Sequence, residues 1–165
     1  MMRFSPLPLR TAGFTLIELL VVVTIAMLVL GGALAAFINF TDRRAVLNGV
    51  GELKTYLDRA QARARTGDVG GCDELVGYRV QTYLNNNVTE LSFQAVCETG
   101  TPNTAQVVYL PSGVTVSPNL DLTFSVLNAG VDLGAASQDI TVANDSHSYL
   151  FTLYQEGRMS EGDWQ

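Results

Sequence analysis

An apolar run without a single charge, residues 19–38, constrains this chain more than any other feature of its sequence. Its length matches the roughly 20 apolar residues that an α-helix needs to cross a hydrocarbon core about 30 Å thick. A polar leader, residues 1–13, precedes it with Arg3 and Arg10 as its only charges, and residues 39–165 have an ordinary soluble composition. We therefore expect a membrane-spanning helix over residues 14–38, followed by a part that can bury its own core.

A carboxylate, Glu18, lies at the start of this apolar segment. A charge near the centre of a span costs about 2.5–3.5 kcal/mol, so such residues usually have a function and a partner. Cleavage after Gly13 would give Phe14 a free amine, four residues from Glu18, and the positive end of the helix dipole also favours a carboxylate there. An uncut signal anchor with a chance glycine is the alternative at this point.

The residues Gly13-Phe14-Thr15-Leu16-Ile17-Glu18, followed by a long apolar run, resemble the class III signal of type IV pilins and type II secretion pseudopilins. The motif is specific because glycine, phenylalanine and glutamate occupy fixed positions beside a span. The resemblance implies cleavage after Gly13 by the prepilin peptidase and N-methylation of Phe14. It also implies that Glu18 pairs with the Phe14 amine of an adjacent subunit during filament assembly.

The same resemblance implies where the protein lies and what it meets. The leader would be in the cytoplasm, the span in the cytoplasmic (inner) membrane, and the remainder in the periplasm or extracytoplasmic space. The implied partners are other pilin or pseudopilin subunits, the prepilin peptidase and methyltransferase, the inner-membrane assembly platform, and membrane lipid.

Residues 39–66 keep helical spacing and predict an amphipathic helix that continues the span. Apolar side chains recur at steps of three and four, which places six of them on one helix face: Val46, Val50, Leu53, Leu57, Ala60 and Ala64. We expect this stripe to pack on the head, with a coiled-coil seam as the alternative. We place four basic residues opposite the stripe: Lys54, Arg59, Arg63 and Arg65. Gly67 fits the C′ position that ends a helix.

If span and amphipathic segment form one helix, it is about 80 Å long at 1.5 Å per residue. Glycines weaken it at Gly31-Gly32 and again at residues 49–51. Pilin spans melt locally inside filaments, so the resemblance makes Gly31-Gly32 the expected place for such a melt.

Beyond Gly67 the apolar pattern alternates, which predicts an antiparallel β head over residues 67–165 and an α+β fold. A hairpin is expected from strands 76–84 and 90–97 around the asparagines at 85–87. The inward side chains would be Val76, Tyr78 and Val80 on one strand and Leu91, Phe93 and Ala95 on the other. Further strands are expected at 105–110, 114–117, 121–128, 139–143, 148–155 and 158–160, with a turn at 128–130 among those between them.

Two cysteines, Cys72 and Cys97, follow the span and would pair if the head is exported. Folding the hairpin about Asn86 places Cys97 opposite residue 75, and Cys72 lies three residues beyond. We therefore favour a disulfide, worth about 3–4 kcal/mol on the chain-entropy model. Reduced core thiols are the alternative if the head stays in the cytosol.

The order of span, amphipathic helix and β head, with YLPSGVTV in its middle and FTLYQEGRMS near its end, resembles the H-type minor pseudopilins and related minor type IV pilins. The resemblance implies a two-sheet β-sandwich that rests on the helix. The calcium loop of the major G-type pseudopilins has no match here, because the aspartates of this part are scattered. We expect no metal and no other cofactor.

Charge and motifs favour a structural subunit over an enzyme. Segment 42–66 carries six basic and three acidic residues, whereas two arginines face twelve acids beyond it, which disfavours nucleic acid as a partner of the head. Arg158, among acids, is a poor phosphate contact. His147 lies between two serines in an expected turn, and sequence adjacency does not make a catalytic set. The chain has no P-loop, CxxC or HExxH pattern.

Two other functions stay open from the sequence. One is a binding module at a filament tip, for DNA uptake or adhesion, with Tyr154 and Trp164 as the expected exposed aromatic pair. The other is a plain membrane-anchored β domain that enters no filament.

Overall fold

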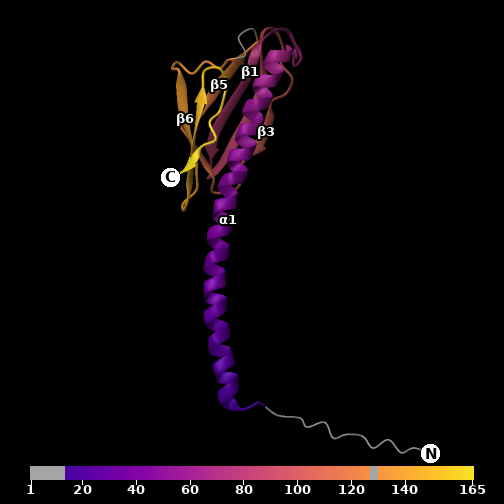
Figure 1. Cartoon of the computed structure of the whole chain (residues 1–165). Helices are drawn as coiled ribbons and strands as arrows, with labels where there is room; N and C mark the ends of the chain where they lie inside the picture. Colours follow the sequence, from indigo (N-terminus) through magenta and orange to yellow (C-terminus); the bar gives the residue numbers. More distant parts are fainter. Residues whose placement is uncertain (1–13, 127–129) are drawn as a thin grey trace, which may run out of the picture. The chain divides into compact units, whose positions relative to one another are not determined.

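The computed structural model describes residues 14–126 and 130–165 (Figure 1). The expected leader with Gly13 lies outside these residues. Residues 127–129 also lie outside them, and the expected strand 121–128 and turn 128–130 extend into that gap. The chain divides into two compact units, one up to Ile38 and one from Asn39 to Gln165. Helix α1 (Leu16–Thr66) contributes residues to both, and all the strands lie in the second.

Both ends of α1 have side-chain or backbone caps. The Thr15 hydroxyl accepts a hydrogen bond from the Glu18 N–H at 3.2 Å, which satisfies one of the donors that the first turn leaves open. At the other end Gly67 has φ 65°, the Asp68 N–H donates to the Arg63 carbonyl at 3.2 Å, and the Gly67 N–H donates to the Ala64 carbonyl at 3.4 Å. This is a Schellman motif, so the predicted stop at Gly67 is confirmed.

The first unit presents apolar side chains to its surroundings. Leu16, Leu28 and Leu30 are 88%, 78% and 68% exposed, and the most apolar 18-residue window of α1 has a mean hydropathy of 2.7 with none of its residues buried. Thr24, the polar residue within this run, donates to the carbonyl oxygens of Leu20 and Val21. This part of α1 is therefore long and apolar enough to cross a membrane, with its backbone satisfied internally.

In the second unit, one face of α1 packs into the head. All six residues of the predicted stripe are buried, at 0–6% exposure: Val46, Val50, Leu53, Leu57, Ala60 and Ala64. The prediction that this face packs on the head is confirmed. Gly49 lies on the same face, and a Cβ there would come within 2.9 Å of a Val114 methyl, so this glycine lets the helix approach the head closely.

Within the described residues, the head contains eight strands in two four-stranded antiparallel sheets. The first sheet has the order β3-β2-β1-β5, with β3 Gln106–Tyr109, β2 Val88–Gly100, β1 Cys72–Asn85 and β5 Asp121–Ser125. The second has the order β4-β6-β7-β8, with β4 Thr115–Ser117, β6 Ser137–Ala143, β7 Ser148–Tyr154 and β8 Asp163–Trp164. The expected α+β fold, a long helix on a two-sheet antiparallel head, is confirmed.

Both sheets and the helix share one hydrophobic core. The first sheet contributes Tyr78, Val80, Leu91, Phe93, Leu122 and Phe124; the second contributes Val116, Ile140, Val142, Phe151 and Leu153. In Figure 1 the C-terminal part of α1 runs along the head beside strands of the first sheet. A shared core of this kind means that the amphipathic part of α1 is a structural layer of the head.

The β1–β2 hairpin is longer than expected and irregular at its open end. Asn86 and Asn87 have φ of 49° and 62°, a left-handed pair that makes the two-residue turn between the strands. Irregularities between Cys72 and Gly77 shift the alternation, so that Gly77 is buried and Val76 is 40% exposed. The prediction that Val76 faces inward is therefore wrong, whereas Tyr78, Val80, Leu91, Phe93 and Ala95 are buried as predicted.

The C-terminal segment also differs from expectation. The expected strand at 158–160 is reduced to a single bridge between Met159 and Leu153, and the last strand is Asp163–Trp164, which pairs with β7. Tyr154 and Trp164 are half-buried, so they are not an exposed aromatic pair. The Trp164 ring packs edge-on against Tyr149 and His147 and lies under the Arg43 guanidinium.

Substitution of Gly77 tests the packing of β1 on β5, because the Gly77 backbone lies against β5. A Cβ at this position would come within 2.2 Å of the Phe124 carbonyl oxygen, so Gly77→Ala forces β1 and β5 apart. We expect a loss of about 1–3 kcal/mol, typical of overpacking. The measurement is urea unfolding of the full chain in detergent, followed by the fluorescence of Trp164, its one tryptophan.

Gly51→Ala is the matched control, since nothing lies within 4 Å of a Cβ there. Alanine in place of glycine in a helix should be neutral or stabilising by up to about 1 kcal/mol. Equal unfolding midpoints for the two variants would contradict the close packing of β1 on β5.

Candidate functional site

The N-terminal motif is described from Phe14 onward. Phe14 is 77% exposed and precedes the first residue of α1 by two positions, and Glu18 lies in the first turn. Glu18 forms no ion pair within 4 Å among the residues that the structure describes. The apolar helix therefore carries a carboxylate at its N-terminal end, where the helix dipole favours negative charge.

Thr15 is a functional residue of this motif that sequence reasoning missed. Its hydroxyl caps the helix by accepting the Glu18 N–H. The signal was available, because threonine followed three residues later by glutamate is the spacing of a capping box. The cap fixes where the helix begins and so fixes Glu18 in its first turn.

Gly31 and Gly32 lie within the helical part of α1, and nothing lies within 4 Å of a Cβ at either position. The expected melt concerns an assembled filament, and it stays a prediction.

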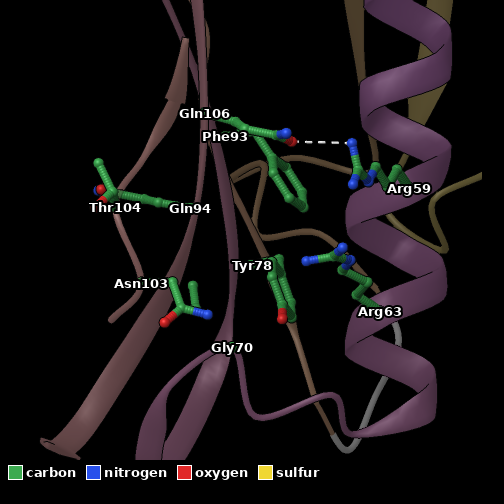
Figure 2. A pocket seen from close by; sticks show the side chains of 10 residues that line it. Arg59, Arg63, Gly70, Tyr78, Phe93, Gln94, Asn103, Thr104 and Gln106 are labelled. Atoms are coloured by element: carbon green, nitrogen blue, oxygen red, sulfur yellow. Dashed lines mark hydrogen bonds between the residues drawn. The ribbon is translucent and has the colours of Figure 1, made fainter. Parts of the chain in front are cut away.

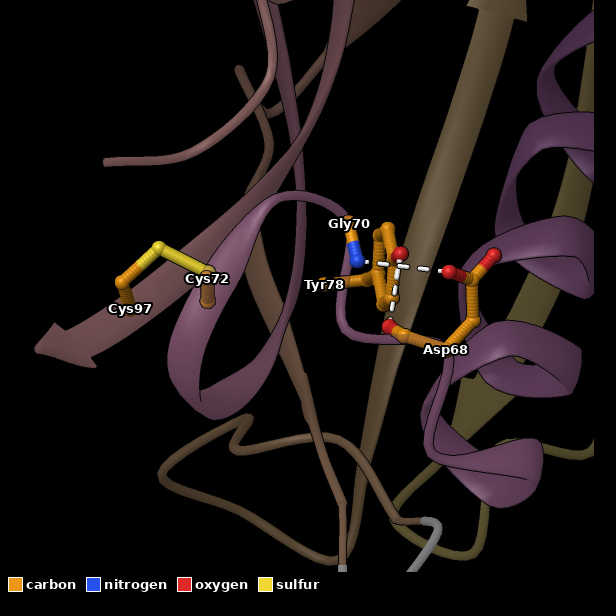
Figure 3. Close-up of a disulfide and its surroundings, with 5 residues drawn as sticks. All are labelled: Asp68, Gly70, Cys72, Tyr78 and Cys97. Carbon is orange, nitrogen blue, oxygen red and sulfur yellow. Dashed lines mark hydrogen bonds between the residues drawn. A yellow bond between two sulfur atoms is a disulfide. The ribbon is translucent and has the colours of Figure 1, made fainter. Parts of the chain in front are cut away.

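In the head, the structure joins Cys72 and Cys97 in a disulfide with a Cα–Cα distance of 5.3 Å (Figure 3). Leu75 is the register partner of Cys97, as the fold about Asn86 predicted, and Cys72 is the partner of Gly100. The disulfide is therefore diagonal across the hairpin, at the irregular end of the ladder. It fixes the part of β1 that follows the helix-to-sheet connection.

The connection itself is held by Asp68 and Tyr78 (Figure 3). The Tyr78 hydroxyl donates to the Asp68 carbonyl at 2.9 Å, and the Gly70 N–H donates to the Asp68 carboxylate at 3.2 Å. Burial raises the pKa of Tyr78, Asp68 raises it further, and Arg63 and Arg59 oppose the shift. The hydroxyl therefore stays protonated at neutral pH and remains a donor to Asp68.

Three of the four basic residues that we expected opposite the stripe contact the head instead. The Lys54 ammonium donates to the Ser160 and Glu161 carbonyls at 2.8 and 3.0 Å, and desolvation lowers its pKa against the opposing charges of Asp58 and Glu161. Arg59 and Arg63 lie over aromatic rings of the first sheet, while Arg65 is exposed. The expected placement of all four on the far face is correct for Arg65 alone.

A pocket of about 200 Å³ lies where Arg59 and Arg63 approach the first sheet, and we call it the arginine pocket (Figure 2). Tyr78 and Phe93 are stacked beneath the arginines, with ring centroids 5.3 Å apart. Asn103 and Thr104, from the segment that leads into β3, and Gln106, the first residue of β3, also line it. The arrangement combines cationic and amide groups with an aromatic floor.

His147 has a packing role in the structure. Its Nε2 lies 2.7 Å from the Asn39 Oδ1, and its ring packs edge-on against Trp164. The contact ties the turn between β6 and β7 to α1. Across residues 14–126 and 130–165, no three histidine, cysteine or acidic side chains are grouped so that they could hold a metal ion.

Comparison with known protein families gives a match over residues 9–34. These residues match the prokaryotic N-terminal methylation motif. Neither the curated proteins nor the solved structures include a match to the chain. The matched segment contains Gly13, Phe14 and Glu18 and supports a pilin-like, prepilin-processed subunit with a single membrane anchor.

We expect the folded head to lose stability when the Cys72–Cys97 disulfide is reduced. The bond closes a loop between residues 25 apart, which on the chain-entropy model is worth about 3–4 kcal/mol. We expect the double variant Cys72→Ser/Cys97→Ser to unfold at a correspondingly lower urea concentration, again followed by Trp164 fluorescence. Adding reductant should lower the midpoint of the wild type and leave that of the variant unchanged; equal midpoints throughout would contradict the role of the bond.

Proposed function

We propose that this chain is a minor pilin or pseudopilin, a structural subunit of a type IV pilus-like or type II secretion pseudopilus filament. The observation that carries the proposal is the methylation motif at residues 9–34, placed at the start of an apolar helix. In this proposal the prepilin peptidase cuts after Gly13, the new N-terminus at Phe14 is methylated, and the subunit then enters the filament.

Assembly would depend on two opposite charges within lipid. Cleavage gives Phe14 an amine, and Glu18 supplies a carboxylate in the first turn of the same helix. Placing either charge in a hydrocarbon environment costs free energy, and this cost is much smaller when the two opposite charges are paired. Pairing of the Glu18 carboxylate with the amine of a neighbouring copy sets the axial position of one helix against the next.

The two units have different roles in this proposal. The first unit anchors the subunit in the cytoplasmic membrane before assembly and packs with other spans afterwards, and a melt at Gly31-Gly32 would let it adjust. The second unit faces the periplasm or extracytoplasmic space, where a disulfide is stable. The assembly platform and the prepilin peptidase are the membrane partners.

The arrangement of the head supports the comparison with H-type minor pseudopilins. Two antiparallel sheets and the amphipathic half of α1 enclose one core. No specific observation favours a DNA-uptake or adhesion role over this one. The twelve acids beyond the helix disfavour a nucleic acid ligand of the head.

Processing is tested by Gly13→Val. A branched side chain before the cut should block the peptidase, so the purified variant should keep residues 1–13 and have no methyl group on Phe14. Intact-mass measurement of the chain from its native membrane reads both changes. Ala12→Val is the control: it places the same side chain one residue earlier and should be processed normally. Loss of the leader from the Gly13 variant would contradict the proposed cleavage site.

Assembly is tested by Glu18→Ala. The variant should insert into the membrane and be cleaved, because the span becomes more apolar, but it should be depleted at least tenfold from sheared filaments. Quantitative immunoblotting of filament and membrane fractions measures this ratio. Thr24→Ala is the control, since the Thr24 hydroxyl is bonded within its own helix. Equal filament content in the two variants would remove the assembly role of Glu18.

A further inference from the structure

The arginine pocket holds two cationic side chains close to aromatic rings of the first sheet. Arg59 and Arg63 are one helical turn apart on α1, and both project toward the first sheet (Figure 2). Their guanidinium carbons lie 5.4 and 5.6 Å from the Phe93 ring centroid, and that of Arg63 lies 5.7 Å from Tyr78. Stacking on rings fixes two flexible cations in place, which lowers the entropy lost when an anion binds between them.

The charges of the two arginines are only partly balanced within the chain. Arg63 approaches the Asp68 carboxylate through its Nε at 3.5 Å, and that carboxylate also accepts the Gly70 N–H. Arg59 donates to the neutral Gln106 Oε1 at 2.9 Å and has no carboxylate within 4 Å in the described part of the chain. The charge of Arg59 is therefore not paired with a carboxylate in the described part of the chain, and a guanidinium has five N–H donors in all.

The opposite wall is polar and held in place. The Asn103 N–H donates to the Gly70 carbonyl at 2.8 Å, which fastens the segment before β3 to the connection after α1. Asn103 and Thr104 are exposed and bring an amide and a hydroxyl to the pocket. With about 200 Å³ of space, the pocket accepts a group of side-chain size, but not an extended polymer.

We propose that the arginine pocket binds a carboxylate side chain from the acidic head of a second copy of this chain. Guanidinium groups form paired, charge-assisted hydrogen bonds with carboxylates, and the aromatic floor accepts the apolar stem of a glutamate or aspartate. The chain itself offers the complement, because its head beyond α1 has twelve acids against two arginines. The source of the carboxylate rests on the proposed filament function, whereas the chemistry of the pocket does not.

The chemistry is tested on the full chain in detergent by NMR of the arginine Nε–H groups. Sodium acetate, added at constant ionic strength, should shift the signals of Arg59 and Arg63 several-fold more than that of exposed Arg65. Sodium chloride at the same ionic strength should shift them less. Equal shifts for all three arginines, or shifts with chloride as large as those with acetate, would overturn the carboxylate site.

The source is tested by placing a photo-crosslinking amino acid at Thr104 in the full chain in its native membrane. We expect an inter-chain product joined to an acidic segment of a second head. The product should fall at least fivefold in R59Q/R63Q and persist in R65Q, with Trp164 fluorescence checking that each variant is folded. Cross-links to lipid alone, or products unchanged in R59Q/R63Q, would overturn the neighbouring head as the ligand.

The two levels of the proposal fail separately. An N-terminus that keeps its leader, together with selective acetate shifts, would refute the filament function and leave the pocket as a carboxylate site. A cleaved and methylated Phe14 without selective shifts would refute the pocket and leave the filament function.

Discussion

The burial of one face of α1 against the head is the interaction on which the rest of the head depends. The six-residue stripe from Val46 to Ala64 is at most 6% exposed and belongs to the same hydrophobic core as residues of both sheets. Polar contacts run along both sides of it. Asn39, Lys54 and Gln61 bond to His147 and to the C-terminal segment, while Arg59 bonds to Gln106 of the first sheet. The stripe supplies the apolar burial, and these bonds fix how the helix lies along the head.

The same helix is built for two environments. From Leu19 to Ile38 the helix carries no charge and its large apolar side chains are exposed, whereas beyond Asn39 the apolar side chains of one face are buried. A helix that is apolar all round is stable where its surroundings are apolar, and a striped helix is stable on a protein core. Glu18 departs from this pattern at the end where a cleaved chain would carry an amine, and Thr15 caps the helix at that place.

The connection between α1 and the β1–β2 hairpin contains contacts that stabilise the head, and it shares Tyr78 with the arginine pocket. The Schellman turn at Gly67, the Tyr78–Asp68 bond and the Cys72–Cys97 disulfide all lie within this connection. Tyr78 takes part in it through its hydroxyl and forms the floor of the arginine pocket through its ring. The pocket thus occupies one of the most constrained parts of the head, which suits a site that must hold two cations in fixed positions.

The sequence by itself determined the span, the buried stripe, the helix stop at Gly67 and most of the strands, because each depends on local periodicity or on one residue's backbone preference. Tertiary structure alone decided the rest. Val76 lies outward because the β1–β2 ladder is irregular before Gly77. The last strand to pair with β7 contains Trp164, whereas residues 158–160 form only a single bridge. Lys54, Arg59 and Arg63 contact the head instead of lying on the far face of the helix. Long side chains can reach either way from a helix flank, so their direction depends on which rings and carbonyl groups the folded head places within reach.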